Sequence, residues 1–345
     1  MTTVRADERA LAGWLLACCA VLLALVMLGG ATRLTGSGLS IVEWRPVTGV
    51  LPPLSEAAWQ QEINKYRQSP EYQNVNRGMS LAQFKTIFWF EYWHRLLARS
   101  LGLLFALPLA WFWLRGRVPQ RLRWPLLGIL ALGAAQGYMG WYMVKSGLVD
   151  IPRVSHYRLA AHLTLALLIY AAMFWLMLGL AWRRVATRPS VLPPGLFSLL
   201  LCLVAATVLF GAFVAGLRAG YAYSTFPLMD GRLIPQGLLH LEPAWRNFSE
   251  NPLTVQFTHR CLAMLTAGAA LAVWVVGLRR SRDRGLRLAL HALLIAVVLQ
   301  VAAGIATLLL YVPVWLGTLH QGLAVIVLST VLTLGYALRT EAGPA

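Results

Sequence analysis

The residues with the clearest capacity for chemistry are two copies of one histidine–arginine pattern. The first half of the chain contains Glu91-Tyr92-Trp93-His94-Arg95, and the second half contains Gln256-Phe257-Thr258-His259-Arg260. Each copy lies where a polar segment runs into a long apolar one. Because imidazole is both a metal ligand and a proton carrier, the duplication predicts two related sites. The copies differ three residues before the histidine, where only the first has a carboxylate.

Two further histidines, His162 and His320, complete a set of four, one in each of four apolar runs. We expect all four to lie about 5–10 Å inside the same end of their helices. A histidine in a membrane helix is costly unless it is paired or ligated, and a hydrogen bond to a neighbouring helix is the alternative for each one. Two imidazoles that face each other across a four-helix bundle can ligate a haem iron axially. Zinc would require four compact ligands or an open water position, and a proton relay would extend across the membrane, so the pattern favours haem.

Composition identifies the elements that carry these histidines. Of the 345 residues, 58% are hydrophobic and 12% are charged, which is typical of a polytopic membrane protein. Eight apolar runs are long enough to span a bilayer. They are Leu11–Ala31, Phe88–Leu114, Trp124–Val144, Leu159–Trp182, Leu196–Leu217, Thr254–Leu278, Leu286–Leu310 and Gly317–Leu338. The sequence therefore predicts an all-α integral membrane protein with eight transmembrane helices.

The net charge of +17 arises from basic residues in short connections and near the chain ends, so it indicates membrane topology rather than nucleic-acid binding. These residues are Arg5, Arg9, Arg115, Arg117, Arg121, Arg123, Arg183, Arg184, Arg188, Arg279, Arg280, Arg282, Arg284, Arg287 and Arg339. All fall on one side of the predicted membrane, which the positive-inside rule makes cytoplasmic. Both termini are then cytoplasmic, and the long connections Thr32–Ile87 and Arg218–Leu253 lie outside, near the four histidines.

The predicted helices form a tandem repeat. The histidine–arginine pattern recurs, and Gln136-x-x-x-Gly140 matches Gln300-x-x-x-Gly304. Four spans in each repeat keep both repeats in the same orientation. We therefore expect two pseudo-equivalent four-helix bundles, residues 1–190 and 191–345, each with one site in its core.

Two serines in the first outer connection are predicted helix N-caps. Ser55 precedes a short amphipathic segment, Glu56–Gln68, and Ser80 precedes a helix that continues into the second apolar run.

Other residues with chemical potential do not fit the repeat. His156 and His240 are expected in outer loops, and His291 is expected to be a core or interfacial residue near the inner end of its helix. The four cysteines are expected to be small core residues rather than disulfide or metal partners. They are Cys18, Cys19, Cys202 and Cys261. The sequence leaves the roles of Arg33 and Arg99 open.

The residues around the first histidine allow alternative roles. Arg95 and Arg260 are candidates for pairing with haem propionates, and Arg95 has the alternative of an i,i+4 salt bridge with Glu91. Glu91 lies one turn from His94, so its carboxylate can exchange a proton or stabilise positive charge on a substrate bound there. The alternative is that Glu91 anchors its helix through Arg95. Gln256 cannot titrate, which suits a haem that only transfers electrons.

These segments together resemble the haem A synthase family over nearly the whole chain. The segment after the first apolar run and the Glu-x-x-His helix are the most specific parts. The residues that carry the resemblance are Gly30-Ala31-Thr32-Arg33-Leu34-Thr35-Gly36-Ser37-Gly38-Leu39-Ser40, Glu91-x-x-His94-Arg95, Gln136-Gly137-x-x-Gly140, His162, His259-Arg260 and His320. The resemblance implies an oxidation of the C8 methyl of haem O to a formyl group, which gives the haem A of terminal oxidases.

The resemblance also implies roles for single residues. His259 and His320 would ligate a b-type haem in the C-terminal half, and His94 and His162 would hold the substrate haem O in the N-terminal half. Glu91 matches the glutamate that is essential in the family. Some relatives have a cysteine pair in the first outer loop, whereas this chain has none there, so a mechanism that needs a thiol or disulfide at that site is in doubt.

We expect a multi-pass protein of a bacterial plasma (inner) membrane, with both haem sites towards the outer face. The implied partners are haem O, membrane lipid, haem O synthase and an electron donor that the sequence does not identify, and an oligomer is compatible with these features.

Two other classes of protein predict different features. A di-haem b-type cytochrome that only carries electrons predicts two equivalent sites, and the Glu91/Gln256 difference together with the long outer connections disfavours it. A repeat transporter would have helices broken at the membrane midplane and polar residues through the full depth, which these apolar runs lack. The sequence therefore favours a membrane oxidoreductase acting on haem O.

Overall fold

The computed structural model describes residues 2–45, 48–149, 151–182 and 191–339. Within these ranges the chain forms α-helices, short 3₁₀ turns and loops, with one isolated β-bridge and no named strand. The predicted all-α class is therefore confirmed. The predicted basic tract Arg183, Arg184 and Arg188 lies outside the described residues.

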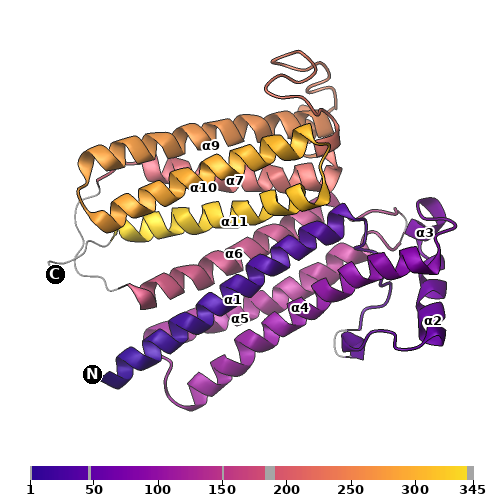
Figure 1. Ribbon diagram of the computed structural model, residues 1–345, viewed down its shortest axis with the longest axis horizontal. Helices are drawn as coiled ribbons and strands as arrows, with labels where there is room; N and C mark the ends of the chain where they lie inside the picture. The colour runs from indigo at the N-terminus through magenta and orange to yellow at the C-terminus, as the bar shows by residue number, and fades with distance from the viewer. Residues whose placement is uncertain (1, 46–47, 150, 183–190, 340–345) are drawn as a thin grey trace. The chain divides into compact units, whose positions relative to one another are not determined.

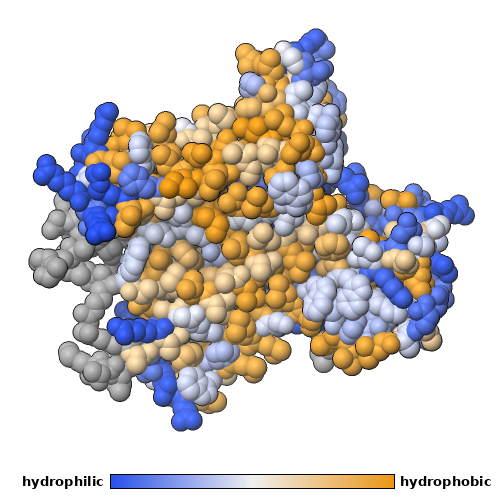
Figure 2. All heavy atoms as spheres, in the orientation of Figure 1, coloured by the Kyte–Doolittle hydropathy of each residue, from blue (hydrophilic) through white to orange (hydrophobic). Residues whose placement is uncertain are grey.

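Within the described residues, seven helices have the length and apolar composition needed to cross a membrane. They are α1 (Thr2–Leu34, apolar over Ala6–Leu34), α4 (Leu81–Leu114), α6 (His156–Ala181), α7 (Leu196–Leu217), α9 (Pro252–Arg280), α10 (Arg284–Leu309) and α11 (Val314–Ala337). Figure 2 shows apolar side chains along the flanks of the long helices and charged side chains near their ends. These features define a multi-pass membrane protein.

An eighth long helix, α5 (Gln120–Lys145), covers the predicted span Trp124–Val144 but is not among the seven. Its second half contains Gln136, three glycines and several aromatic residues, which lower its hydropathy. Eight spans therefore stay a prediction.

Both predicted serine caps are confirmed. The Ser55 hydroxyl accepts a hydrogen bond from the Ala58 amide at the start of α2 (Glu56–Arg67). Ser80 forms a capping box with Gln83 at the start of α4, which continues without a break for 34 residues into the apolar segment. One continuous helix thus runs from the Ser80 cap past His94.

Removing the α4 cap is expected to loosen only the first turn of that helix. An N-cap serine contributes about 1 kcal/mol, so Ser80→Ala should raise amide hydrogen exchange at Gln83 about fivefold. Ser55→Ala is the matched control and should affect the start of α2 instead. Unchanged exchange at Gln83 in Ser80→Ala would contradict the role of this cap.

Residues 20–166 form one compact unit. Its outer part contains an aromatic core in which Trp59, Ile63 and Tyr66 of α2 pack on Phe84 and Phe88 of α4. The Tyr66 hydroxyl donates a hydrogen bond to Glu71 in the short helix α3 (Pro70–Asn74), and burial raises the pKa of this tyrosine. This core holds α2 and α3 against the N-terminal half of α4.

Residues 1–19 and 167–345 form the other compact unit. Helices α7, α9, α10 and α11 pack around an apolar core (Figure 1) that includes Leu200, Val273, Leu290 and Val331. The second half of α6 contacts α11, since the Tyr170 hydroxyl and Ser329 Oγ lie 2.8 Å apart. The boundary between residues 190 and 191 was inferred from the sequence repeat, and it stays a prediction.

Candidate functional site

The four predicted histidines lie in four different long helices. His94 is in α4 and His162 is in α6, whereas His259 is in α9 and His320 is in α11. All four side chains are partly buried. The structure therefore places each of these histidines in a long helix and not in a loop.

The histidines approach each other in two pairs, one within each compact unit. His94 and His162 lie close enough to interact electrostatically, and so do His259 and His320. Within the described residues, no group of three or more His, Cys, Asp and Glu side chains comes together as a bare metal ion would need. Two facing imidazoles suit a haem instead, because the porphyrin supplies the other four ligands.

The ring nitrogens of these histidines have few protein partners. The Nδ1 of His259 lies 3.1 Å from the Thr207 carbonyl oxygen in α7. The Nδ1 atoms of His94, His162 and His320 are buried without a hydrogen-bond partner. An Nδ1–H directed at a carbonyl leaves the lone pair of Nε2 for a metal, so His259 has the tautomer that axial ligation requires.

Gln136 contacts His162 from α5. Its Nε2 donates a hydrogen bond to the His162 carbonyl oxygen at 3.0 Å and lies 3.4 Å from the His162 Nε2. An amide donor next to Nε2 favours the tautomer with the proton on Nδ1. Gln136 would have to turn aside for an iron to occupy the same position.

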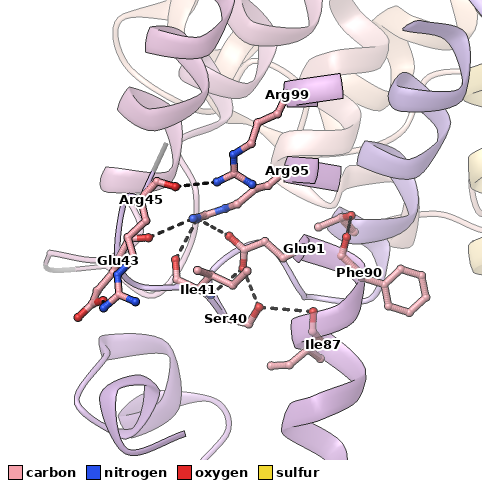
Figure 3. A network of polar contacts seen from close by, with 10 residues as sticks. Ser40, Ile41, Glu43, Arg45, Ile87, Phe90, Glu91, Arg95 and Arg99 are labelled. Carbon is pink, nitrogen blue, oxygen red and sulfur yellow. Dashed lines mark hydrogen bonds and ion pairs between the residues drawn. The ribbon is translucent and has the colours of Figure 1, made fainter. Parts of the chain in front are cut away.

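The Glu91 carboxylate is buried, with 3% of its surface exposed, and accepts three hydrogen bonds (Figure 3). Its Oε2 accepts from Ser40 Oγ at 2.7 Å and from the Ile41 amide at 2.8 Å. Its Oε1 accepts from Arg95 Nη2 at 2.6 Å. The i,i+4 salt bridge that the sequence allows is therefore present, and Glu91 also fastens an outer loop to α4.

Two arginines extend this contact along α4 (Figure 3). Arg95 also donates to the carbonyl oxygens of Ile41 and Glu43, at 2.9 and 3.2 Å. One turn further along, Arg99 Nη2 donates to the Arg45 carbonyl oxygen at 2.8 Å. The loop thus follows α4 towards its interior, and the side chains of Glu91, Arg95 and Arg99 hold it there.

The second half of the chain uses the equivalent positions in the same way. Gln256 Nε2 donates to the Tyr223 carbonyl oxygen at 2.9 Å. Arg260 donates to the carbonyl oxygens of Tyr223 and Thr225, at 3.0 and 2.8 Å. Both copies of the pattern therefore join a histidine helix to the outer loop that precedes it.

Sequence reasoning did not identify the loop partners Ser40, Ile41, Tyr223 and Thr225. The segments 35–40 and 221–227 are rich in turn residues, but their sequences do not indicate which helix they contact. The available signal was the arginine that follows His94 and His259 within an apolar run, because such a side chain requires acceptors.

The remaining histidines lie outside the two pairs. His156 is the first residue of α6, so its prediction as a loop residue is wrong. The Nδ1 of His240 lies 2.7 Å from the Gly237 carbonyl oxygen in a loop, as predicted, and the outer position of that loop stays a prediction. His291 is exposed on α10 and accepts a hydrogen bond from Trp274 Nε1 at 3.1 Å. Of the two predicted alternatives, the core position is therefore wrong, and the interfacial position stays a prediction. Trp274 thus provides a hydrogen-bond partner for the Nδ1 atom of His291 while the imidazole ring stays exposed.

The four cysteines differ in their burial. Cys18 and Cys19 are buried in α1, as predicted, whereas Cys202 and Cys261 are exposed. The core prediction is wrong for the latter two, because the outward faces of membrane helices are as apolar as their packed faces. All four are free thiols.

The fold and the four histidines define a class: a multi-pass helical membrane protein with two pairs of neighbouring histidines in its long helices. A family model described as cytochrome oxidase assembly protein matches residues 12–332. The heme A synthase of Rhizobium meliloti (strain 1021) is 49% identical over 322 residues, covering 93% of this chain and 88% of the relative. The heme A synthase of Nitrosospira multiformis is 49% identical over 339 residues, covering 97% and 95%.

A third relative, the heme A synthase of Sinorhizobium fredii, is 50% identical over 324 residues, covering 93% of this chain and 88% of the relative. The chain belongs to the haem A synthase family. The family that the sequence resembles is thereby confirmed.

Proposed function

We propose that this chain is an oxidoreductase that converts the C8 methyl of haem O to a formyl group and so makes haem A for terminal oxidases. The observation that carries the proposal is identity of about one half to heme A synthases along at least 93% of the chain. The two pairs of partly buried histidines support it, because the reaction needs a haem substrate and a route for electrons.

His94 and His162 are assigned to the substrate haem O, and His259 and His320 to a b-type haem. A bound haem b would supply one-electron redox chemistry. The chain itself supplies imidazole ligands at fixed positions on rigid helices, and apolar helix faces that keep water from the ring. Arg95 and Arg260 are assigned to the propionate-bearing edges, and their present contacts with loop carbonyls keep both guanidinium groups at the loop-facing ends of the helices.

Glu91 is assigned a catalytic role next to His94. Its carboxylate is three residues from the histidine and is held by Ser40, Ile41 and Arg95. A carboxylate fixed in this way can stabilise positive charge that develops on an oxidised methyl carbon without any rearrangement. To accept a proton it would first have to exchange one of its three donors, so the electrostatic role fits the contacts better.

The proposed architecture has eight spans in two tandem bundles, residues 1–190 and 191–345, with both termini in the cytoplasm of a bacterium and the haem sites towards the outer face of the inner membrane. The basic residues of the short connections support this orientation. Haem O is the proposed substrate, and haem O synthase and an electron donor are the proposed partners.

The function is tested in a bacterial host whose own haem A synthase has been removed, so that haem O and the host's electron donors are still present. Extracted membrane haems are identified by mass, with empty vector as the control. We expect haem A, or an intermediate with one added oxygen, only with this chain. An extract with haem O and haem b alone, from a protein that binds b, would instead support the di-haem electron carrier.

A further inference from the structure

Each of the four paired histidines lies against a glycine in the long helix that precedes its own. These contact glycines are Gly29 in α1, Gly140 in α5, Gly211 in α7 and Gly304 in α10, and they face His94, His162, His259 and His320 in that order. A Cβ built on each glycine would meet the histidine Cε1 at 2.9, 3.2, 3.1 and 2.8 Å. Real Cβ atoms almost never approach a heavy atom more closely than 3.0 Å, so a side chain at Gly29 or Gly304 requires the ring to move. The contacts at Gly140 and Gly211 are tighter than nine in ten real Cβ contacts, so a side chain there requires the ring to give by a few tenths of an ångström.

The rings present the same edge to all four glycines. Cε1 is the nearest atom and Nδ1 is the next, at 3.4, 3.8, 3.7 and 3.3 Å. At Gly29, Gly211 and Gly304 the Nε2 atom also lies within 4 Å of the built Cβ. There it is the more distant of the two nitrogens, at 3.8, 3.9 and 3.6 Å. Each imidazole therefore directs its Nδ1 edge towards the neighbouring helix.

The main chain beside Gly211 receives this edge. Thr207, whose carbonyl oxygen lies 3.1 Å from the His259 Nδ1, is four residues before Gly211. Lacking a Cβ, the glycine exposes the carbonyl one turn earlier, and a proton held on Nδ1 leaves Nε2 free to ligate.

These four positions are glycines because there is little room for a side chain, and not because the backbone has an unusual conformation. All four have ordinary helical backbone angles, and alanine is the better helix former at such positions. Several other glycines of the long helices, including Gly13, Gly137 and Gly268, have no heavy atom within 4 Å of a built Cβ. At Gly277 and Gly335 a built Cβ would meet an apolar side chain, that of Leu290 at 2.6 Å and that of Phe197 at 2.7 Å. Close contacts therefore occur at some other helical glycines as well, but at the four contact glycines the neighbouring group is an imidazole.

We propose that the four contact glycines are positioning residues that set the orientation and depth of the haem-ligating imidazoles. This inference rests on the proposed haem ligation. Gly211 and Gly304 position the ligands of the b-type haem, and Gly29 and Gly140 position those of the substrate haem. A methyl group at any of them displaces the imidazole from its neighbouring helix and moves Nε2 relative to the iron.

The test compares alanine variants of the holoprotein purified from membranes. Gly304→Ala and Gly211→Ala are measured against Gly268→Ala, and Gly140→Ala against Gly137→Ala in the same helix. The readouts are the haem-to-protein ratio, the low-spin absorption and electron paramagnetic resonance spectra, and the reduction potential. We expect Gly304→Ala and Gly211→Ala to retain haem b about tenfold more weakly, as when other groups that orient a metal ligand are lost, with altered low-spin spectra.

Gly140→Ala should weaken retention of added haem O and leave the b-type spectrum unchanged, whereas Gly137→Ala and Gly268→Ala should match the unmodified protein. If Gly304→Ala fails to fold, Gly211→Ala carries the test, because its 3.1 Å contact requires a smaller displacement. Contact variants whose spectra and haem retention equal those of their controls would overturn the inference. Equal haem loss in the controls would overturn it as well. Unmodified protein without low-spin haem b would refute the proposed haem ligation itself, which is a separate result.

Discussion

Replacing His259 by alanine is expected to remove the b-type haem from the purified protein and to abolish haem A formation. The imidazole is the proposed axial ligand, and its Nδ1 is oriented by the Thr207 carbonyl in α7. Loss of one of two axial ligands should lower the retained haem b about tenfold or more. Product formation should fall with it, because the electrons for the oxidation site would lack their route.

The control for His259→Ala is His291→Ala, which removes a hydrogen-bonded histidine from the same compact unit. His291 accepts a hydrogen bond from Trp274 and has no place in a histidine pair, so its variant should keep the haem content and spectrum of the unmodified protein. Added imidazole should restore a low-spin spectrum to His259→Ala by occupying the vacated space. An unchanged haem spectrum in His259→Ala without imidazole would show that this histidine does not ligate the haem.

The positions of the histidines were predictable because they depend on a pattern local to each helix. Apolar runs of membrane length fix where helices occur, and Ser55 and Ser80 fix where two of them begin. The periodicity of a helix then places His94 and Glu91 one turn apart without any knowledge of tertiary structure. The all-α class and the membrane location followed from the same local information.

The loop contacts were not predictable, because they join residues about fifty positions apart through a segment with no periodicity. Ser40 and Ile41 meet Glu91 through one hydroxyl and one main-chain amide. Any residue supplies a main-chain amide, so the identity of Ile41 has no bearing on that contact. The same reasoning applies to the carbonyls of Tyr223 and Thr225. The glycine contacts are intermediate: Gly140 and Gly304 were visible as a repeated spacing, but the atoms that face them were not.

The contacts of Glu91 and Gln256 show which explanations of the difference between these two residues are possible. Comparison of the two copies in the sequence favours catalysis for the carboxylate, with helix anchoring as its alternative, and connects the amide with a haem that only transfers electrons. Both side chains have 3% of their surface exposed, and both fasten an outer loop to a histidine helix. Anchoring alone therefore cannot explain why one copy has a charge, since an amide performs that task in the other.

Glu91→Gln is expected to lower haem A formation about 10²-fold or more while the protein retains haem O and haem b. The amide keeps the volume of the side chain and an oxygen that can accept from Ile41 or Ser40. It loses the negative charge opposite Arg95 and the capacity to stabilise a developing positive charge, and groups of this kind typically contribute 10²–10⁴-fold. The measurement is haem A per mole of purified or membrane-bound protein, with haem content determined in the same sample.

Ser40→Ala distinguishes catalysis from anchoring. It removes the Ser40 hydroxyl contacts with Glu91 and with the Ile87 carbonyl oxygen, yet leaves the Glu91 carboxylate charged and bound to Arg95 and the Ile41 amide. If Glu91 acts through its charge, Ser40→Ala should retain much more activity than Glu91→Gln although it loosens the loop. Equal activity in the two variants would mean that the loop contact is what matters.

Glu91→Ala is the less informative variant. Removing one partner of a buried ion pair typically costs on the order of 3–5 kcal/mol, so lost activity would be confounded with lost structure. Gln256→Ala provides the mirror measurement in the other half, where one hydrogen bond to the Tyr223 carbonyl oxygen is lost. It should leave haem A formation within about fivefold, because a single neutral hydrogen bond typically contributes about 1 kcal/mol. A Gln256→Ala loss as large as that of Glu91→Gln would assign both residues to loop anchoring and would remove the charge from the mechanism.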